Sequence, residues 1–565
     1  MRSMPTAMTP DPTRPARAHG APLAAAPRLV TDMFDRTVER HGDDPAIDFL
    51  GRVTRWRELA GLVERAAAGL SGLGVGQGTR VALCLPNTPF YPVLYLATLR
   101  LGGVVVNVNP LYVERELEHL LADSGAEVIA TIDVADVHGR VSRVAERRGV
   151  RHVVTCRLAD ALPRSKALLY CLFRRKEIFR APRDARHVKF ARLIASGAAP
   201  EPVRVSPDDV AVLQYTGGTT GLPKAAMLTH AGLVANADAM VAHLGEPAGS
   251  ERIMGVLPLF HVFALTTVLN SALRTGSQMV LLPRFELEQL LATLARTRPT
   301  YLPAVPTLLH ALAGAAEKRS LDLSYLRACI SGGAPLPAEV RAAFERATGA
   351  TVVEGYGLSE ASPILACNPV ESGNRDGSAG IPFPGTTIEI RDPEAPHALL
   401  PIGEVGEVCA AGPQIMRGYW NKLDETAGVL ADGMLRTGDL GRLDEDGYLF
   451  LVDRLKDVIL CGGYNVYPRV LEEALYEHPE VAEAVVIGVP DPYRGQAPKA
   501  FVVLRAPATG TPETLRAFLA ERISKIELPR EIELRDTLPK TLVGKLSKKE
   551  LVEEERLKAA AAAVN

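Results

Sequence analysis

The feature that most constrains the fold of this chain is a regular alternation of short β-branched runs with helical stretches in its first two thirds. Strand-like runs such as "RVALCLP", "GGVVVNVNP", "AEVIATID" and "RHVVTCR" alternate with helical stretches such as "ERELEHLLADSG". This rhythm is typical of parallel βαβ units. The sequence therefore predicts an α/β fold whose large N-terminal region, residues 28–454, is built on doubly wound sheets.

The pattern changes after the segment "IPFPGTTIEIRD". Short strands separated by glycine turns follow, as in "GEVGEVCAAGPQIMRGYW", and they favour a small antiparallel β-barrel or sheet within the large region. From about Lys456 a shorter unit begins, with a helix at "VYPRVLEEALYEHP" and strands at "EAVVIGVP" and "KAFVVLRA". We therefore expect a small α+β domain over residues 455–565.

Length and composition narrow the class of protein. A chain of 565 residues is too long for a single core, and 47% hydrophobic residues with a net charge of -2 argue against a disordered or a nucleic-acid-binding protein. The seven cysteines form no C-x-x-C pair, so neither a disulfide framework nor a zinc site is indicated, and a reducing cytoplasm fits best. Residues 1–27 are rich in proline and lack the apolar run of a signal peptide; we expect a disordered tail, with a transit peptide as the alternative.

Two segments raise the question of membrane contact. Residues 253–273 carry no formal charge, but Pro258, His261 and Asn270 are among the residues that interrupt them, so a buried strand, turn and helix is expected rather than a membrane span. Residues 164–192 are rich in arginine and lysine, with apolar residues between the basic ones. Such a segment either lies on an anionic bilayer or is a solvated surface excursion, and the sequence leaves both readings open.

A glycine- and threonine-rich loop lies within residues 214–230, "QYTGGTTGLPKAAMLTH". Glycines let backbone N–H groups approach an anion closely, and threonine hydroxyls with a lysine add donors and a positive charge. The loop is not a Walker A motif, because Pro223 precedes the lysine and Ala225 follows it. It predicts a polyphosphate site, with a flexible linker as the alternative. The candidate ligands are Thr216, Gly217, Gly218, Thr219, Thr220, Gly221 and Lys224.

Three further stretches carry candidate functional residues. Glu360 follows a tight turn in "EGYGLSEASP", where a carboxylate can hold a hard cation beside phosphates or can simply cap a helix. Asp439 in "LRTGDLG" can accept both hydroxyls of a ribose or serve as an ordinary turn residue. Lys545 in "LPKTLVGK" is either a functional lysine or one member of a solvated lysine cluster.

The motifs "YTGGTTG", "GYGLSEASP", "LRTGDLG", "DRLKD", "GGYNVYP" and "LPKTLVGK" occur in this order, and together they resemble the acyl-adenylate-forming superfamily of acyl-CoA synthetases, luciferases and peptide-synthetase adenylation domains. The resemblance covers roughly residues 30 to 555. Details such as Gly217 and the run "LPLFHVFAL" are most similar to bacterial long-chain fatty-acid–CoA ligases. Ala225 replaces the usual glycine and Ser359 the usual threonine, and both changes are small.

The resemblance implies a role for each candidate residue. Residues 28–454 would form an AMP-binding domain and residues 455–565 a mobile C-terminal domain, with Lys456 at a hinge near residues 454–457. Thr216 and the rest of the glycine–threonine loop would bind the β- and γ-phosphates, Glu360 would hold Mg²⁺, and Lys545 would be the catalytic lysine. The backbone of residues 331–334 would line the acyl and adenine pocket. The other nucleotide-site candidates are Gly333, Ala334, Tyr356, Gly357, Ser359, Asp439, Arg454 and Gly463, with Tyr356 near adenine and Asp439 and Arg454 on the ribose.

The function implied by the resemblance is a two-step ligase reaction. ATP and a long-chain fatty acid would give acyl-AMP and pyrophosphate, and CoA would then take the acyl group with release of AMP. His261 is counted among the catalytic candidates at the mouth of the acyl pocket, unless it is merely a buried histidine. A medium-chain or aryl acid CoA ligase, and an acyl-AMP ligase that loads a carrier protein, remain alternatives. The expected partners are a fatty acid, ATP, Mg²⁺ and CoA in the cytoplasm, without nucleic acid; a homodimer and contact of residues 164–192 with the inner face of the membrane stay open.

Overall fold

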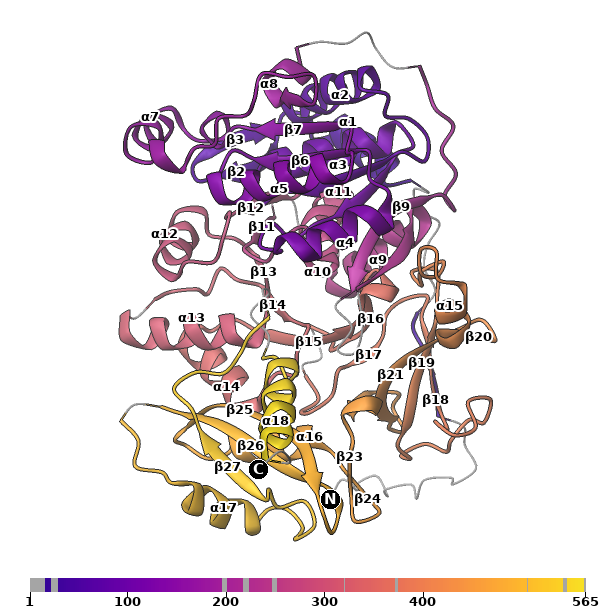
Figure 1. The fold of residues 1–565 in the computed structure, drawn as a ribbon, viewed down its shortest axis with the longest axis vertical. Coiled ribbons are helices and arrows are strands. Elements are labelled where there is room, and N and C mark those ends of the chain that lie inside the picture. The colour runs from indigo at the N-terminus through magenta and orange to yellow at the C-terminus, as the bar shows by residue number, and fades with distance from the viewer. Residues whose placement is uncertain are drawn as a thin grey trace, which may run out of the picture.

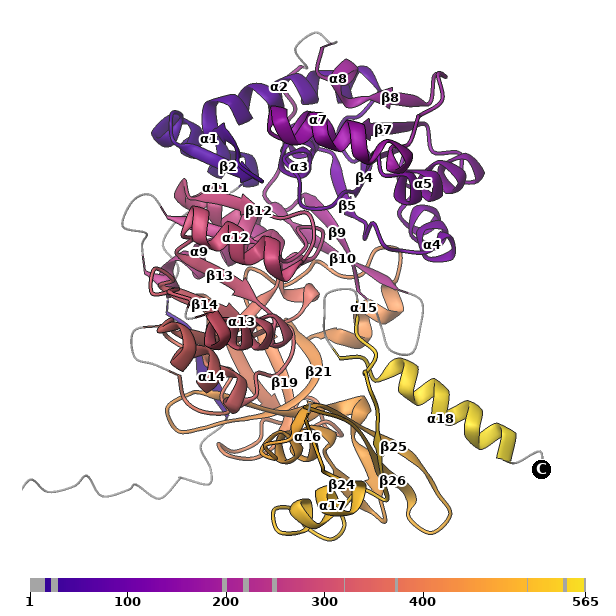
Figure 2. The same ribbon diagram turned by 90° about the vertical axis from the view of Figure 1, so that its left-hand side faces the viewer.

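The computed structural model describes residues 16–21, 29–195, 201–216, 223–245, 251–319, 321–370, 374–505, 507–541 and 546–562. Figures 1 and 2 show the chain from two sides, with the C-terminal elements below the larger N-terminal part. Helices alternate with parallel strands in the large part, antiparallel strands follow, and a smaller α+β unit ends the chain. The expected fold class is thereby confirmed.

The first sheet contains the strands that the β-branched runs predict. Its order is β10-β9-β5-β4-β6-β7-β8, and its neighbours are parallel except for the antiparallel pair of β9 and β10. The strands are β4 (Arg80–Cys84), β5 (Val104–Asn107), β6 (Val128–Ile132), β7 (His152–Cys156), β8 (His187–Lys189), β9 (Val210–Thr216) and β10 (Lys224–Thr229). Because β4 to β7 are buried on both faces, their sequences are continuous apolar runs rather than alternating ones.

The second sheet has the order β17-β16-β15-β14-β13-β11-β12-β2-β3. Its central strands from β15 to β2 run parallel, and the strands at both ends are antiparallel. The strands are β2 (Pro45–Phe49), β3 (Arg52–Arg55), β11 (Arg252–Gly255), β12 (Gln278–Leu281), β13 (Tyr301–Ala304), β14 (Ala328–Ser331), β15 (Val352–Gly357), β16 (Ile364–Cys367) and β17 (Ile381–Pro382). Because β14 and β15 are parallel neighbours, the motifs that follow them leave the sheet at the same edge.

The helices of the large part pack around these sheets, and one of them joins the sheets into a single core. Every residue of α3 from Phe90 to Leu99 is buried, within a core cluster that contains strands of both sheets. A helix that is apolar on all sides is stable only inside a protein. The helices are α1 (Val30–His41), α2 (Trp56–Gly72), α3 (Phe90–Arg100), α4 (Glu114–Ser124), α5 (Ala135–Arg147), α6 (Leu158–Ala161), α7 (Arg164–Phe173), α8 (Phe190–Leu193), α9 (His230–Leu244), α10 (Val262–Ala264), α11 (Ser271–Thr275), α12 (Leu287–Thr297), α13 (Pro306–Arg319), α14 (Ala338–Thr348) and α15 (Leu423–Val429).

Residues 253–273 form the buried strand, turn and helix that the sequence predicts. After β11 and a turn, the chain forms α10, a π-helix over Leu265–Asn270, and α11. The sequence does not predict the π-helical stretch, in which Thr266 Oγ1 donates a hydrogen bond of 2.8 Å to the distant backbone oxygen of Ser362. Among the residues that the structure describes, no helix combines the length and apolar character needed to cross a bilayer.

The third sheet is antiparallel and comes from the region of glycine turns. Its order is β1-β18-β19-β21-β20, with β22 on β21. The expected disorder of residues 1–27 is wrong for residues 17–19, because β1 pairs with β18 as an edge strand. Ala16 and Ala18 are buried there, and Arg17 forms an ion pair with Glu389, contacts that the proline-rich composition does not reveal. The strands are β1 (Arg17–His19), β18 (Thr387–Arg391), β19 (Gly406–Ala411), β20 (Leu430–Ala431), β21 (Met434–Leu443) and β22 (Leu449–Arg454).

The fourth sheet belongs to the smaller C-terminal unit. Its order is β24-β23-β26-β25, with β27 on β26. All its strands follow the 3₁₀-helix Leu455–Asp457, so sheet membership changes at the expected hinge, while the domain boundary there stays a prediction. The elements are β23 (Ile459–Cys461), β24 (Tyr464–Val466), α16 (Pro468–Tyr476), β25 (Val481–Asp491), β26 (Gly495–Leu504), α17 (Pro512–Ala520), β27 (Glu531–Leu534) and α18 (Lys549–Ala562).

Candidate functional site

The turn after β15 places an acidic residue beside the two strands that flank the glycine-rich loop. The 3₁₀-helix Ser359–Ala361, which contains Glu360, packs against β9 and β10 of the first sheet. Gly357 permits this turn, because a Cβ added there would lie 2.1 Å from the backbone oxygen of Pro363. The same oxygen accepts a hydrogen bond of 3.0 Å from the N–H of Leu358. Only glycine fits at this close approach.

Tyr356, Asp439 and Arg454 form one polar group. Tyr356 Oη donates a hydrogen bond of 2.7 Å to Asp439 Oδ2, and Arg454 Nε lies 3.3 Å from Oδ1 of the same carboxylate. The pairing of β21 with β22 places Asp439 opposite Arg454. Burial raises the pKa of Asp439, and the positive charge of Arg454 opposes that shift. The structure therefore brings together the three residues that the resemblance assigns to the nucleoside.

Glu360 and Lys224 both contact Tyr419, a residue outside the recognised motifs. Tyr419 Oη donates a hydrogen bond of 2.8 Å to Glu360 Oε1, and Lys224 Nζ lies 5.3 Å from the centre of the same ring. Burial, followed by the charge of Glu360, raises the pKa of Tyr419 well above its ordinary value, so its hydroxyl stays a donor. The sequence signal for Tyr419 is only an aromatic pair after a glycine in "RGYWN", and no spacing rule connects it to Glu360.

Thr216 and Lys224 flank the glycine-rich loop. They end β9 and begin β10, and the two residues are paired in register. Thr216 Oγ1 donates a hydrogen bond of 3.3 Å to the backbone oxygen of Lys224, so the arms of the loop are closed at its base. The candidates Gly217, Gly218, Thr219, Thr220 and Gly221 lie outside the described residues.

The turn after β14 packs against the segment of His261. A Cβ added at Gly332 would lie 2.9 Å from the ring of Phe263. The N–H of Phe263 donates a hydrogen bond of 3.3 Å to His261 Nδ1, so the histidine caps α10. Gly333 has a φ of +84°, which favours glycine, and Ala334 beside it is half-buried. His261 therefore lies beside the expected acyl-pocket backbone and also has a structural role.

A polar cavity of about 220 Å³ lies between the acidic turn and the Thr437–Gly438 turn. Two carboxylates and a guanidinium contribute to its wall, and Arg436 forms an ion pair of 2.6 Å with Glu407. This composition suits a polar ligand. The lining residues are Leu358, Glu360, Glu407, Tyr419, Gly428, Val429, Leu435, Arg436, Thr437 and Gly438.

A second cavity, of about 30 Å³, is mainly apolar and adjoins the strands beneath the Gly332 turn. One of its walls is Ile330 in β14, directly before Ser331. Ligand pockets usually exceed about 300 Å³, so in this conformation the cavity admits only a small group. The lining residues are Met240, Val241, Leu244, Gly245, Ile253, Thr267, Ser271, Thr275, Ser277, Tyr301 and Ile330.

Glu360 is the carboxylate expected to hold Mg²⁺. Within the described ranges, no three or more histidine, cysteine, aspartate or glutamate side chains are grouped as a metal site would require. Mg²⁺ in nucleotide sites is usually bound by one or two carboxylates, with substrate phosphates and water as the other ligands. The position of Glu360 at the wall of the polar cavity fits this kind of site.

Lys456 lies at the expected hinge, and Gly463 lies on its C-terminal side. Lys456 is in the 3₁₀-helix that follows Arg454, and burial, followed by the charge of Arg454, lowers the pKa of Lys456. Gly462 and Gly463 form the two-residue turn between β23 and β24, with φ values of +59° and +85°. Positive φ at both positions is what a type I′ hairpin needs. The structure leaves Gly463 exposed in this hairpin and does not bring it to the group around Asp439.

Lys545 lies outside the described residues, but both arms of its loop are described. Lys540 and Leu546 form an antiparallel bridge at the base of the loop. On the far arm, Lys548 Nζ lies 3.1 Å from Glu472 of α16. The base of the loop is therefore part of the smaller C-terminal unit.

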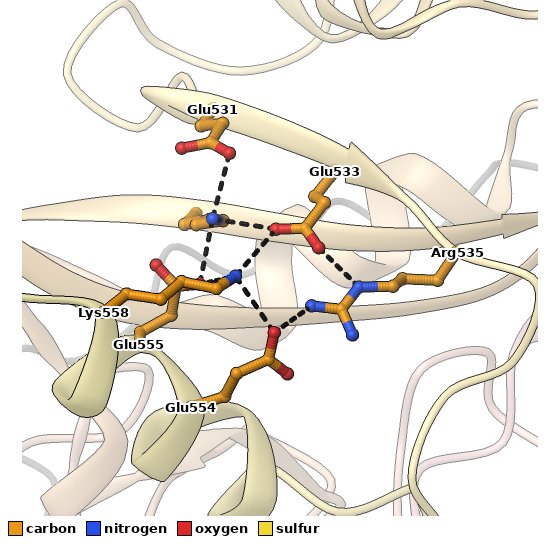
Figure 3. Close-up of polar contacts among 7 residues, drawn as sticks. Glu531, Glu533, Arg535, Glu554, Glu555 and Lys558 are labelled. Carbon is orange, nitrogen blue, oxygen red and sulfur yellow. Dashed lines mark hydrogen bonds and ion pairs between the residues drawn. The ribbon is translucent and has the colours of Figure 1, made fainter. Parts of the chain in front are cut away.

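An ion-pair network fixes α18, the helix that follows this loop. The Lys499 side chain in β26 is only 4% exposed, and its Nζ lies 2.9–3.0 Å from three carboxylates, those of Glu531, Glu533 and Glu555. Because Glu555 lies on α18 while the other two lie on β27, Lys499 connects the helix to the sheet. Arg535 and Lys558 pair with carboxylates of the same network. Figure 3 shows this network, with Glu531, Glu533, Arg535, Glu554, Glu555 and Lys558 labelled.

Known proteins share this sequence pattern and this fold. Residues 34–420 match the family model described as AMP-binding enzyme, and residues 470–545 match the AMP-binding enzyme C-terminal domain. A long-chain-fatty-acid–CoA ligase of Bacillus subtilis (strain 168) is 41% identical, over 94% of this chain and 95% of the relative. A feruloyl-CoA synthase of Amycolatopsis sp is 36% identical, over 91% of this chain and 95% of the relative. The crystal structure of ATP-bound MatB from Rhodopseudomonas palustris has a TM-score of 0.81 at 29% identity, and the match covers 93% of this chain and 98% of that one.

Proposed function

The chain belongs to the AMP-binding enzyme family, and we propose that it is a ligase that activates a long-chain fatty acid with ATP and transfers the acyl group to CoA. The observation that carries the proposal is that Glu360 and Lys224 both contact Tyr419, at the wall of a polar cavity. The substrate class is supported by the 41% identity to a long-chain-fatty-acid–CoA ligase over nearly the full length of both chains.

The first half-reaction makes an acyl-adenylate. A carboxylate is a poor electrophile because its charge repels nucleophiles. Its oxygen attacks the α-phosphorus of ATP, a P–O bond forms, and the bond to pyrophosphate breaks. Such a transfer depends on positioning and charge neutralisation more than on a covalent protein nucleophile.

The phosphate side of the site would be held by Thr216 and Lys224, which flank the loop and present a hydroxyl and a positive charge. Glu360 would bind Mg²⁺, which when present neutralises phosphate charge. Tyr419 keeps the Glu360 carboxylate in place through its hydroxyl. An ordered carboxylate costs less reorganisation when the transition state forms.

The nucleoside side would be held by Asp439, Arg454 and Tyr356. Asp439 is fixed by both partners, and a carboxylate so placed can accept hydrogen bonds from two ribose hydroxyls. Gly333 and Ala334, in the turn after β14, would line the adenine and acyl side of the site.

The second half-reaction transfers the acyl group. The CoA thiol gives up its proton to water and its sulfur attacks the acyl carbonyl, so that a C–S bond forms and AMP departs as the C–O bond breaks. Lys545 would act in the first step by bringing the two anions together. We propose that the C-terminal unit then turns about Lys456, which withdraws Lys545 and brings the exposed Gly463 hairpin to the thioester site.

The acyl side favours an apolar substrate. The apolar cavity behind β14 lies next to the expected acyl-pocket backbone, and it would have to widen for a long chain. The feruloyl-CoA synthase among the relatives keeps an aryl acid as the second candidate. A cytoplasmic location at the inner face of the membrane is part of the proposal, because all seven cysteines are free thiols and fatty acids partition into bilayers.

The experiment that tests the proposal is a product assay with palmitate, ATP and Mg²⁺, with and without CoA. We expect AMP and palmitoyl-CoA in equal amounts when CoA is present, and enzyme-bound palmitoyl-AMP with pyrophosphate when it is absent. If CoA does not consume the acyl-AMP but a holo acyl-carrier protein does, the chain belongs to the carrier-loading ligases instead. Absence of pyrophosphate release with every carboxylate would contradict the adenylation chemistry.

A further inference from the structure

Helix α7 turns its apolar side away from the protein. Four large apolar side chains of this helix are 53–79% exposed: Leu168, Leu169, Leu172 and Phe173. On a helix, residues four apart share a face, so these positions form one continuous stripe, which we call the α7 stripe. Figures 1 and 2 show α7 at the periphery of the large part, away from the C-terminal unit.

The opposite side of α7 is fixed to the protein. Ala167 and Tyr170 pack against the main core. Lys166 Nζ donates a hydrogen bond of 2.9 Å to the backbone oxygen of Leu50. The orientation of the stripe is therefore set by packing on the other face.

Two apolar residues of the basic segment, Ile178 and Phe179, contact the protein beside α5. The ring of Phe179 stacks on His138 at a centroid distance of 4.2 Å, and its N–H donates a hydrogen bond of 2.8 Å to the backbone of Asp133. Ile178 forms a β-bridge with Val134. The structure thus divides residues 164–192 into an outward stripe and a return segment anchored beside α5.

Cationic side chains without carboxylate partners come after the stripe in the chain. Four of them are exposed and form no ion pair with a carboxylate in the part of the chain that the structure describes: Arg175, Lys176, Arg180 and Arg183. The acidic residues of the segment are already engaged, because Glu177 lies 2.6 Å from Arg174 and Asp184 lies 2.9 Å from His187. The segment that follows the stripe in the chain therefore carries an excess of exposed positive charge.

Stable helices of soluble proteins turn their apolar stripe inward, and an exposed apolar stripe with a polar rim marks an interaction site. The excess positive charge selects an anionic partner. The ten residues of α7 span about 15 Å, which suits a helix lying in the interfacial zone of a bilayer. We infer that the α7 stripe docks on an anionic lipid bilayer, with the stripe between the headgroups and the four cations on the lipid phosphates. The inference rests on the membrane location in the proposed function and deepens it by naming the surface that binds, while vesicle binding does not depend on catalysis.

The test is co-sedimentation of the full chain, without substrates, on two kinds of vesicle: phosphatidylcholine alone, and phosphatidylcholine with about 30% phosphatidylglycerol. We expect binding to the anionic vesicles at low salt and a loss of at least tenfold in the partition coefficient between about 0.05 and 0.5 M NaCl. Vesicles of phosphatidylcholine alone should bind weakly.

Two variants with matched controls separate the apolar and the charged contributions. Leu168→Ser/Leu172→Ser should lower the partition coefficient by about tenfold or more, while Leu557→Ser, at an exposed leucine of α18, should leave it unchanged. Arg175→Gln/Lys176→Gln should lower it by about 25-fold, or about fivefold for each cation. Arg115→Gln/Lys525→Gln changes the net charge equally at two exposed residues elsewhere and should have little effect.

Insertion of the stripe has its own signature. In a Phe173→Trp variant, we expect the tryptophan emission to shift to shorter wavelength on anionic vesicles and brominated lipid to quench it. Palmitoyl-CoA synthesis in detergent should be the same for all these variants, which separates this inference from the proposed function.

Three results would overturn the inference. The first is no binding to anionic vesicles at low salt. The second is an equal loss in the stripe variant and the Leu557→Ser control. The third is a dimer in light scattering that Leu168→Ser/Leu172→Ser dissociates, without vesicle binding, since this would assign the stripe to a second copy of the chain.

Discussion

The hydroxyl of Tyr419 donates a hydrogen bond of 2.8 Å to Glu360, the residue proposed to hold Mg²⁺. Tyr419→Phe removes this donor and keeps the ring that lies beneath Lys224. Hydrogen bonds to charged groups contribute about 1.5–3 kcal/mol, so we expect kcat/KM for MgATP to fall about 10- to 100-fold. The measurement is the adenylation rate at graded Mg²⁺ concentration.

Tyr325→Phe is the matched control for Tyr419→Phe. It also removes a tyrosine hydroxyl, but one that is buried without a hydrogen-bond partner in the described structure. The control should retain the kinetics of the unmodified enzyme. Wild-type Mg²⁺ dependence in Tyr419→Phe would show that the contact does not position Glu360.

Lys545→Ala should impair adenylate formation far more than thioester formation from supplied acyl-AMP. Losing one preorganised donor typically costs about 10²- to 10³-fold in rate. Lys549→Ala removes an exposed lysine at the start of α18 and serves as the control. Pyrophosphate release and acyl-CoA formation are measured separately, and an equal loss in both would show that Lys545 is structural.

Glu354 predicts a pH dependence of stability. Burial raises the pKa of Glu354 to about 7. Between pH 4.5, the ordinary pKa of a glutamate, and about pH 7, the folded protein holds a proton that the unfolded chain has released. The free energy of unfolding therefore falls as the pH rises through this window, and the loss is complete above about pH 7. The other charged groups that act on Glu354 are Arg469, Glu473 and Arg341.

Glu354→Gln removes the ionisable carboxyl group but keeps a side-chain oxygen. That oxygen can accept the hydrogen bond that Leu336 N–H donates to Glu354 over 3.2 Å in the unmodified protein. We expect the variant and the unmodified protein to have similar Tm values near pH 5. Above pH 7 the variant should be the more stable of the two. Parallel Tm profiles over this range would mean that Glu354 ionises normally.

Lys499→Met should destabilise the C-terminal unit. It removes the cation that three carboxylates share, while Glu533 keeps Arg535 and Glu555 keeps Lys558 as partners. We therefore expect a cost of about 1–3 kcal/mol, less than the cost of about 3–5 kcal/mol for breaking a fully buried pair. Arg556→Met breaks the exposed pair with Glu553 on the same helix and should cost less than about 1 kcal/mol. Thermal unfolding and proteolysis of α18 report the difference, and equal effects would show that the network does not anchor the helix.

Periodicity predicted the elements that are buried on both faces, since the continuous apolar runs correspond to β4, β5, β6 and β7. It missed β1, because three residues that pair at a sheet edge carry no periodic signal. It also missed the π-helical turn at Leu265–Asn270, where a hydrogen bond reaches from Thr266 to Ser362.

In the candidate site, too, the sequence predicted some residues and missed others. The motifs and the resemblance that they carry pointed to Asp439, Arg454 and Glu360. The structure places Glu360 at the polar cavity and brings Asp439 into contact with both Tyr356 and Arg454. Tyr419 was not predicted, because its contact with Glu360 joins residues 59 positions apart. Nor could the charge pattern of residues 164–192 show which apolar side chains face outward, since that depends on how α7 packs.

The central claim, that the substrate is a long-chain fatty acid, is tested most directly by kcat/KM for octanoate, laurate, palmitate and coumarate under one set of conditions. Each methylene buried in an apolar tunnel adds at most about 0.8 kcal/mol, so specificity should rise steeply from octanoate and level off once the tunnel is full. We predict a plateau near palmitate and a low value for coumarate, whose rigid ring cannot follow a narrow channel. A maximum at octanoate or coumarate would contradict the long-chain assignment and leave the adenylation chemistry intact.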